Sequence, residues 1–156
     1  MRSRADRGEE PVERRRPGDG LLLGAILLLG LVLRLFYLRE IAADPTFEYP
    51  LRDAGFHDYW ARALVSGDWT PPHGQPDPRI PHVPFLRPPG YPYFLAGIYA
   101  LTGGSHLAAR IVQMLLGLLG AGLAYRLGRV LLGRAAGLFL AAFCATSWVA
   151  LFYEGD

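Results

Sequence analysis

The stretch LLLGAILLLGLVLRLFYL, residues 21–38, decides the fold because it is apolar throughout except for Arg34. A helix rises about 1.5 Å per residue, so a segment of this length spans about 27 Å, close to the thickness of the hydrocarbon core of a bilayer. We therefore expect a first transmembrane helix over residues 21–38. Arg34 lies about one turn from the polar end of this helix, and we expect its side chain to reach outward to the membrane surface.

Two later apolar runs, residues 107–127 and 135–153, are also long enough to cross a bilayer. The second helix contains small residues at Gly117, Gly120 and Gly122, which allow helices to approach closely in lipid. The third is interrupted only by Thr146 and Ser147, whose hydroxyls can bond back to their own helix. The sequence thus predicts an all-α membrane protein with three transmembrane helices.

The distribution of arginine predicts the orientation of these helices. Arg14, Arg15 and Arg16 precede the first helix, which places the N-terminus in the cytoplasm and makes residues 1–20 a disordered cytoplasmic tail. A cleaved signal peptide is the rival interpretation, but the apolar run is longer than the usual core and no small-residue cleavage site follows it. Residues 128–134 are predicted to be a cytoplasmic turn, because nearby Arg126, Arg129 and Arg134 have no neighbouring acid to balance them.

This topology places residues 39–106 and 154–156 outside the cytoplasm, in a multi-pass protein of the cell membrane. The first of these loops should carry two interfacial helices, near residues 54–66 and 92–102. The second apolar segment, PYFLAGIYAL at residues 92–101, is too short to cross. Between them, the proline-rich segment 70–89 should be extended. Six acidic side chains between positions 44 and 77 make this loop the best candidate for a chemical site: Asp44, Glu48, Asp53, Asp58, Asp68 and Asp77.

Charge and cysteine content exclude some functions. The net charge of +2 does not suggest nucleic-acid binding. The single cysteine, Cys144, permits neither an internal disulfide nor a cysteine metal site. The spacing of His57, His73 and His82 fits no familiar metal-ligand pattern, so we interpret them as ordinary loop histidines.

Three segments together resemble the N-terminal module of polytopic glycosyltransferases of the GT-C fold, especially the bacterial relatives of protein O-mannosyltransferases and the lipid A aminoarabinose transferase. They are DAGFHDYWARALVSGDW at 53–69, PPGYPYFLAGIYALTG at 88–103, and ARIVQMLLGLLGAGLAYRLGRVLLGRAAGL at 109–138. No single one of these motifs is specific, and the resemblance is carried by their order and spacing. In such enzymes the first outward loop carries an essential aspartate, and another acidic motif follows the third crossing. Asp53 and FYEGD at 152–156 occupy those places.

The resemblance implies inverting transfer of a sugar from a polyprenyl-phosphate donor to an acceptor hydroxyl. The partners implied are membrane lipid, the lipid-linked donor, and a protein, lipid or glycan acceptor. No cofactor is otherwise indicated, but some enzymes of this fold use a divalent cation. The implied catalytic residues are Asp53, Glu154 and Asp156, and the candidate substrate-binding residues are His57, Asp58, Tyr59, Arg87 and Tyr91.

Each candidate also has a plainer interpretation. Asp53 suits the N-terminus of a helix beginning at Ala54. Asp58 lies about 140° around that helix from Asp53 and is expected to face solvent. Glu154 and Asp156 can equally be solvated residues at a membrane boundary. Arg87 can pair with any anionic head group, and Tyr91 suits an interfacial anchor.

Two other functions compete with the enzyme. A transporter fragment would need ionisable groups or broken helices within the membrane core. A noncatalytic membrane scaffold would tolerate replacement of the acids. Because related enzymes continue through many more membrane helices, we expect this chain to be the N-terminal piece of a longer protein and to be inactive alone.

The predicted topology can be tested with single cysteines introduced into a Cys144→Ser background. In intact cells, a membrane-impermeant maleimide should label Cys at position 68 and should label Cys at position 130 only after permeabilisation. The opposite pattern would invert the topology.

Overall fold

A computed structural model describes residues 18–71, 80, 82 and 87–155. Its regular elements are all helical: α1 (Gly18–Ile41), the 3-10 helix η1 (Pro45–Phe47), α2 (Arg52–Ser66), α3 (Gly90–Thr102), α4 (His106–Leu132), α5 (Arg134–Thr146) and α6 (Trp148–Gly155). The predicted all-α class is confirmed. The described residues of the proline-rich segment, 70, 71, 80, 82 and 87–89, lie outside the helices, as expected.

Two helices, α1 and α4, are long and apolar enough to cross a membrane, and α5 with α6 forms a third candidate span if the bent pair counts as one. Length and composition thus agree with two or three crossings. The orientation of the helices, and the placement of α2 and α3 at a membrane surface, stay predictions.

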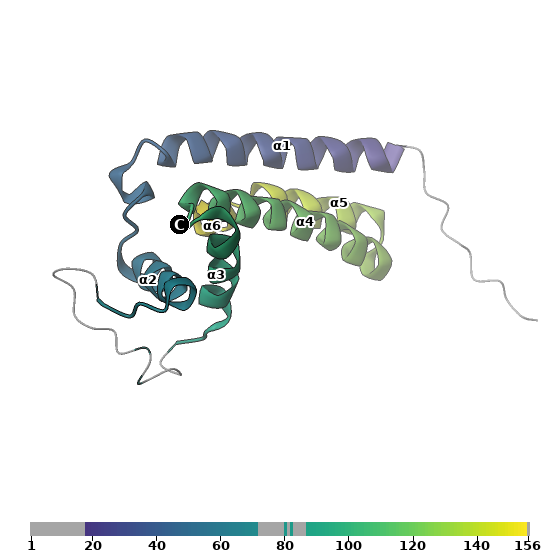
Figure 1. Cartoon of the computed structure of the whole chain (residues 1–156). Helices are drawn as coiled ribbons and strands as arrows, with labels where there is room; N and C mark the ends of the chain where they lie inside the picture. The colour runs from purple at the N-terminus through teal and green to yellow at the C-terminus, as the bar shows by residue number, and fades with distance from the viewer. Residues whose placement is uncertain (1–17, 72–79, 81, 83–86, 156) are drawn as a thin grey trace, which may run out of the picture.

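The three candidate spans lie side by side. Helices α4 and α5 form a hairpin that turns at Gly133, and α1 runs along both of them (Figure 1). The hairpin closes tightly because a Cβ added at Gly137 would meet the Tyr125 carbonyl oxygen at 2.7 Å, and one added at Gly128 would meet Gly137 Cα at 3.0 Å. By contrast, no atom of the described residues lies within 4 Å of a Cβ at Gly120 or Gly122, so the expected role of these two glycines in packing is wrong for the described helices.

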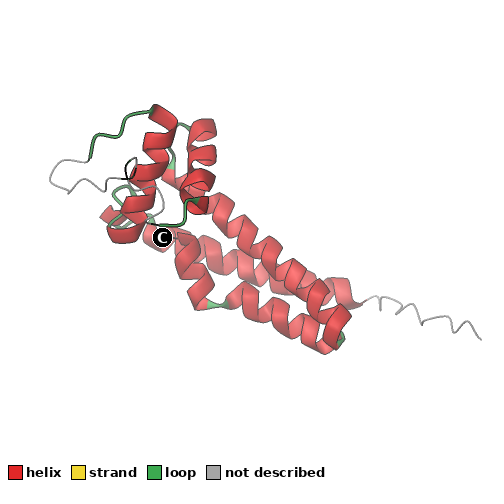
Figure 2. Cartoon of the chain, turned by 90° about the horizontal axis from the view of Figure 1, so that it is seen from below, coloured by secondary structure: helices red, strands yellow, loops and turns green. Residues whose placement is uncertain are grey.

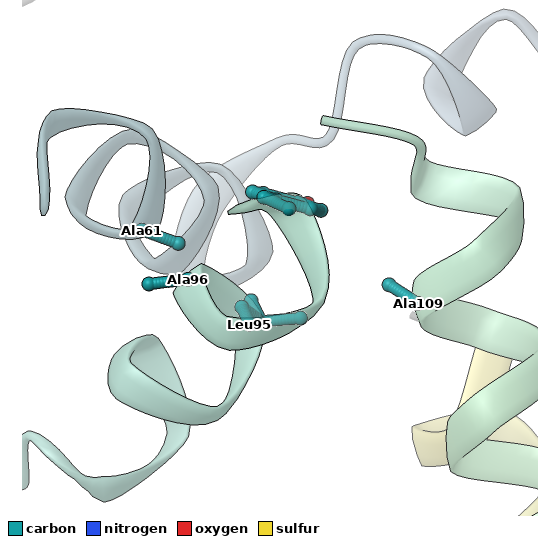
Figure 3. Close-up of a cluster of buried hydrophobic side chains, with 5 residues drawn as sticks. Ala61, Leu95, Ala96 and Ala109 are labelled. Atoms are coloured by element: carbon teal, nitrogen blue, oxygen red, sulfur yellow. The ribbon is translucent and has the colours of Figure 1, made fainter. Parts of the chain in front are cut away.

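The other two helices, α2 and α3, form a smaller unit at one end of the long helices (Figure 2). A small apolar core of Ala61, Leu95, Ala96, Tyr99 and Ala109 joins α2, α3 and the first turns of α4. Figure 3 shows Ala61 of α2 facing Ala96 of α3, with Ala109 of α4 on the other side of Leu95. Alanines at these positions let the helices pack closely, and this core sets where the acidic residues of α2 lie relative to α4.

The predicted third span, residues 135–153, is not one straight helix. It breaks between α5 and α6 with a bend of 42°, and Ser147 at the break is extended, with φ −61° and ψ 120°. Thr146 bonds back to the Ala142 carbonyl at 2.8 Å, as expected for a hydroxyl in a membrane helix. Glu154, predicted to begin a second loop, belongs to α6.

The predicted direction of Arg34 is also wrong. Its side chain is 1% exposed, and its Nε lies 2.7 Å from a carboxylate oxygen of Glu154. Helix α6 supplies a carboxylate partner inside the protein, and the side chain turns inward to meet it.

The predicted boundary between tail and helix needs correction as well. Residues 1–17 of the expected tail lie outside the described residues, but residues 18–20 belong to α1. Asp19 is buried and pairs with Arg134 at 2.6 Å and with Arg129 at 3.4 Å. The arginines of the predicted 128–134 turn are therefore not unbalanced, and only Gly133 there lies outside a helix.

We expect Gly137→Ala to destabilise the protein relative to Gly122→Ala. Both changes add the same methyl group to a helix, but only the first forces it against backbone atoms, at a cost of about 1–3 kcal/mol. Chemical unfolding in detergent micelles, followed by circular dichroism, measures the difference. Equal stabilities for the two variants would contradict the close packing of α4 and α5.

Candidate functional site

The first turn of α2 carries Asp53. The preceding Leu51 is extended and caps the helix without a side-chain bond, and Arg52 has a left-handed φ of 55°. Gly55 allows this turn to fold against the preceding chain, because a Cβ there would lie 2.5 Å from the Pro50 carbonyl oxygen. Asp53 thus lies inside the helix, and the expected N-cap at Asp53 is wrong.

Asp53 pairs with Arg87, whose Nη1 donates to its carboxylate at 2.5 Å. Arg87 also lies over the ring of Phe56, 4.6 Å from its centroid. The hydrogen bond and the positive charge of Arg87 lower the pKa of Asp53 below its usual value. Asp53 is therefore an ionised, largely exposed carboxylate at neutral pH.

His57 lies one turn after Asp53 in α2, and Tyr91 of α3 contacts it. Their rings meet edge to face with centroids 5.2 Å apart. Burial lowers the pKa of His57, as does the charge of Arg87, while Asp53 acts in the opposite direction. A neutral imidazole therefore stands next to the ion pair, and four predicted site residues come together here: Asp53, His57, Arg87 and Tyr91.

Asp53 also borders an open hollow of about 640 Å³. Its walls come from the end of α1, from η1, from the start of α2 and α4, and from α6, which contributes Phe152, Tyr153 and Gly155. Arg110 of α4 lies at its base, where Nε donates to the Gly155 carbonyl at 2.7 Å and Nη1 to the Phe47 carbonyl at 3.0 Å. The hollow thus combines carboxylates, a buried guanidinium and aromatic side chains, a lining suited to a polar ligand with an apolar part.

Asp58 belongs to a different set of contacts. It accepts hydrogen bonds from the Tyr99 hydroxyl at 2.8 Å and from Arg62 Nε at 2.9 Å, and it lies 2.8 Å from His106 Nε2. On the other side of the imidazole ring, Glu48 lies 3.3 Å from His106 Nδ1. The expectation that Asp58 faces solvent is wrong, because α3 and α4 cover this side of α2.

Burial raises the pKa of Asp58, but the hydrogen bonds from His106, Arg62 and Tyr99 together lower it below its usual value of 3.8. Burial and the bond to Asp58 raise the pKa of Tyr99 far above its usual range, so its hydroxyl stays protonated and donates. Asp58 is therefore an ionised carboxylate that joins α2, α3 and α4.

The remaining predicted residues lie elsewhere. Tyr59 donates to the Trp69 carbonyl at 2.6 Å and so fastens the segment after α2. Glu154 pairs with Arg34 between the helices and does not border the hollow beside Asp53. Asp156, His73 and Asp77 lie outside the described residues.

No group of three or more histidine, cysteine, aspartate or glutamate side chains that could hold a metal ion occurs in the part of the chain that the structure describes.

Two buried residues of the site, His106 and Arg110, were missed by the sequence reasoning. Both are at the start of α4. The charge of Arg110 close to the beginning of an apolar run was an available signal, since an ionisable residue within such a run usually has a partner inside the protein. No local pattern marks His106, whose partners lie 48 and 58 residues away in the chain.

Comparison with known proteins finds a similarity in the C-terminal part of the chain. Residues 86–155, which contain α3 to α6, match the family model described as dolichyl-phosphate-mannose-protein mannosyltransferase. The resemblance to protein O-mannosyltransferases is thereby confirmed. No curated protein and no solved structure matches the chain.

We expect Tyr99→Phe to lower the free energy of unfolding by about 1–3 kcal/mol, because it removes a donor from a mostly buried carboxylate. Chemical unfolding in micelles measures this loss. The matched control is Tyr93→Phe on the same helix, where the side chain is 61% exposed and the change should cost less than about 0.5 kcal/mol.

The pH dependence provides a second test of the same contacts. Because folding lowers the pKa of Asp58, its ionised form stabilises the protein above pH 3.8, and this contribution is lost as the pH falls through the folded-state pKa. The stability difference between the wild type and Asp58→Asn should therefore narrow as the pH is lowered from 7 toward 3. A difference that does not change with pH would contradict an ionised Asp58.

Proposed function

We propose that the chain is the N-terminal part of an integral-membrane glycosyltransferase that transfers a sugar from a polyprenyl-phosphate donor to an acceptor hydroxyl on the extracytoplasmic side. The observation that carries this proposal is the match of residues 86–155 to the mannosyltransferase family. Three helices of that segment surround α2, which holds Asp53. Helices α3 and α4 pack against α2, and α6 lines the hollow beside Asp53.

Asp53 is the general base in this proposal. Its carboxylate takes the proton of the acceptor hydroxyl while the acceptor oxygen bonds to the anomeric carbon of the donor sugar. The bond between that carbon and the phosphate oxygen breaks, the phosphate leaves with the bonding electrons, and the configuration inverts. A base must be ionised before it can accept a proton, and the low pKa of Asp53 meets this requirement.

Arg87 is assigned to the donor phosphate. Its planar guanidinium offers several N–H donors in a fork that matches phosphate oxygens, and its bond to Asp53 keeps it beside the base. Negative charge develops on the phosphate as it leaves, so a cation at this position stabilises the transition state more than the ground state.

A transporter is the second candidate, because two features that transport requires occur in the structure. An ionisable pair, Arg34 with Glu154, lies between the candidate membrane helices, and the third candidate span is broken at Ser147. The family match favours the enzyme, since it names a transfer reaction.

The test uses the product of the continuous genomic reading frame that contains this sequence, assayed for transfer from radiolabelled polyprenyl-phosphate sugars. Asp53→Asn should lower kcat by about 100-fold or more, the typical contribution of a general base. The control is Asp68→Asn, which makes the same charge change in the same loop at a residue whose carboxylate accepts from the Thr70 backbone, and it should retain wild-type activity.

Equal activity of Asp53→Asn and the wild type, at equal expression, would remove Asp53 from the mechanism. No sugar transfer by the wild type, together with sugar flux across proteoliposomes, would favour the transporter.

A further inference from the structure

We propose that Arg34 is a positioning residue, which fixes the break between α5 and α6 and so sets the wall of the hollow that faces Asp53. The effect of Arg34 on sugar transfer rests on the proposed function, whereas its effect on the position of α6 does not.

The guanidinium of Arg34 contacts three different helices. Its Nη2 donates to Glu154 Oε1 at 2.7 Å, and its Nε lies 2.7 Å from Glu154 Oε2, so the guanidinium lies against both carboxylate oxygens. Its Nη1 donates to the Ala145 carbonyl at 2.8 Å and to the Gly30 carbonyl of its own helix at 3.1 Å. One side chain of α1 therefore binds both α5 and α6.

The bond from Arg34 to the Ala145 carbonyl lies at the end of α5, next to the break. Ala145 is in the last turn of α5, where carbonyl groups have no partner within the helix. Arg34 supplies a donor to one of these carbonyls inside a buried region, where an unpaired carbonyl would be costly. The break at Ser147 thus occurs where Arg34 can bind the end of one helix and a side chain of the next.

Two glycines make space for the pair. A Cβ at Gly117 of α4 would collide with the Glu154 carboxylate and lie 2.9 Å from Arg34 Nη2. A Cβ at Gly30 of α1 would lie 3.0 Å from both the Cβ and the carbonyl oxygen of Ala145. The helices on either side are therefore shaped around this contact.

The position of α6 matters because α6 lines the hollow. Phe152, Tyr153 and Gly155 border it, and the Gly155 carbonyl accepts from Arg110. Helix α6 is consequently held by two arginines, by Arg34 through Glu154 and by Arg110 through Gly155. Glu154 in this proposal holds α6 and does not act as a catalytic acid or base.

A positioning role differs from a purely stabilising one in a way that can be measured. Replacing a buried ion pair by apolar residues of similar size often leaves stability unchanged. The double variant Arg34→Met/Glu154→Met should therefore remain folded, but it loses the bonds that join α1 to α6 and to the Ala145 carbonyl. The matched control is Asp19→Asn/Arg134→Gln, which removes an ion pair between the first turn of α1 and the start of α5, at the opposite end of α5 from α6.

Two readouts are needed, both in a Cys144→Ser background. The first is the distance between spin labels at Val149 in α6 and Val65 in α2, both exposed, measured by double electron–electron resonance. The second is kcat/KM for sugar transfer by the product of the continuous reading frame, without labels. We expect the Met/Met variant to shift or broaden the distance distribution and to lower kcat/KM about 100-fold, as a displacement of about 1 Å can. The control pair should leave both readouts unchanged.

The outcomes separate the two proposals. An unchanged distance distribution in the Met/Met variant would overturn the positioning role. A changed distribution with wild-type kcat/KM would show that the position of α6 does not matter for the reaction, and would overturn it as well. A changed distribution in a protein whose wild type transfers no sugar would support the role of Arg34 in placing α6, and would reject the proposed function instead.

Discussion

A guanidinium between membrane-sized helices must find a partner inside the protein, and the structure satisfies this requirement with the pair between Arg34 and Glu154. In a medium of low dielectric constant, removing one member would leave an uncompensated charge. The pair draws together α1 and α6, and Gly117 of α4 gives it space. The paths of three helices therefore depend on one contact. The same requirement explains the pairing of Asp19 with Arg134 at the opposite end of α1.

The smaller unit of α2 and α3 is joined to the long helices by a different kind of contact. A core of small apolar side chains brings α2, α3 and α4 close together, and Asp58 then connects all three through Arg62, Tyr99 and His106. Burial disfavours the ionised carboxylate, and the hydrogen bonds from His106, Arg62 and Tyr99 more than offset this effect. These contacts fix the orientation of α2, and so they set how Asp53, on another side of α2, faces the hollow.

Asp53 and Asp58 consequently have distinct environments, although they lie only five residues apart in one helix. Asp53 is exposed, borders the hollow and has one arginine beside it. Asp58 is mostly buried, and its carboxylate is bonded to Arg62, Tyr99 and His106. We therefore assign proton transfer to Asp53 and a connecting role to Asp58. The family match begins after α2, so the evidence for a mannosyltransferase domain and the candidate base come from adjacent segments of the chain.

The amino-acid sequence by itself determined the class of the protein and the existence of its helices. The apolar run at residues 21–38 and the short run at 92–101 predicted one spanning and one shorter helix, because hydrophobic length is a local property. The resemblance to protein O-mannosyltransferases was visible for the same reason, since motif order can be read along the chain. Tertiary structure alone decided how the charged side chains are used. Arg34 has its partner 120 residues away, and Asp58 finds His106 48 residues away. A charged side chain turns outward or inward according to what faces it, and that depends on how distant helices pack.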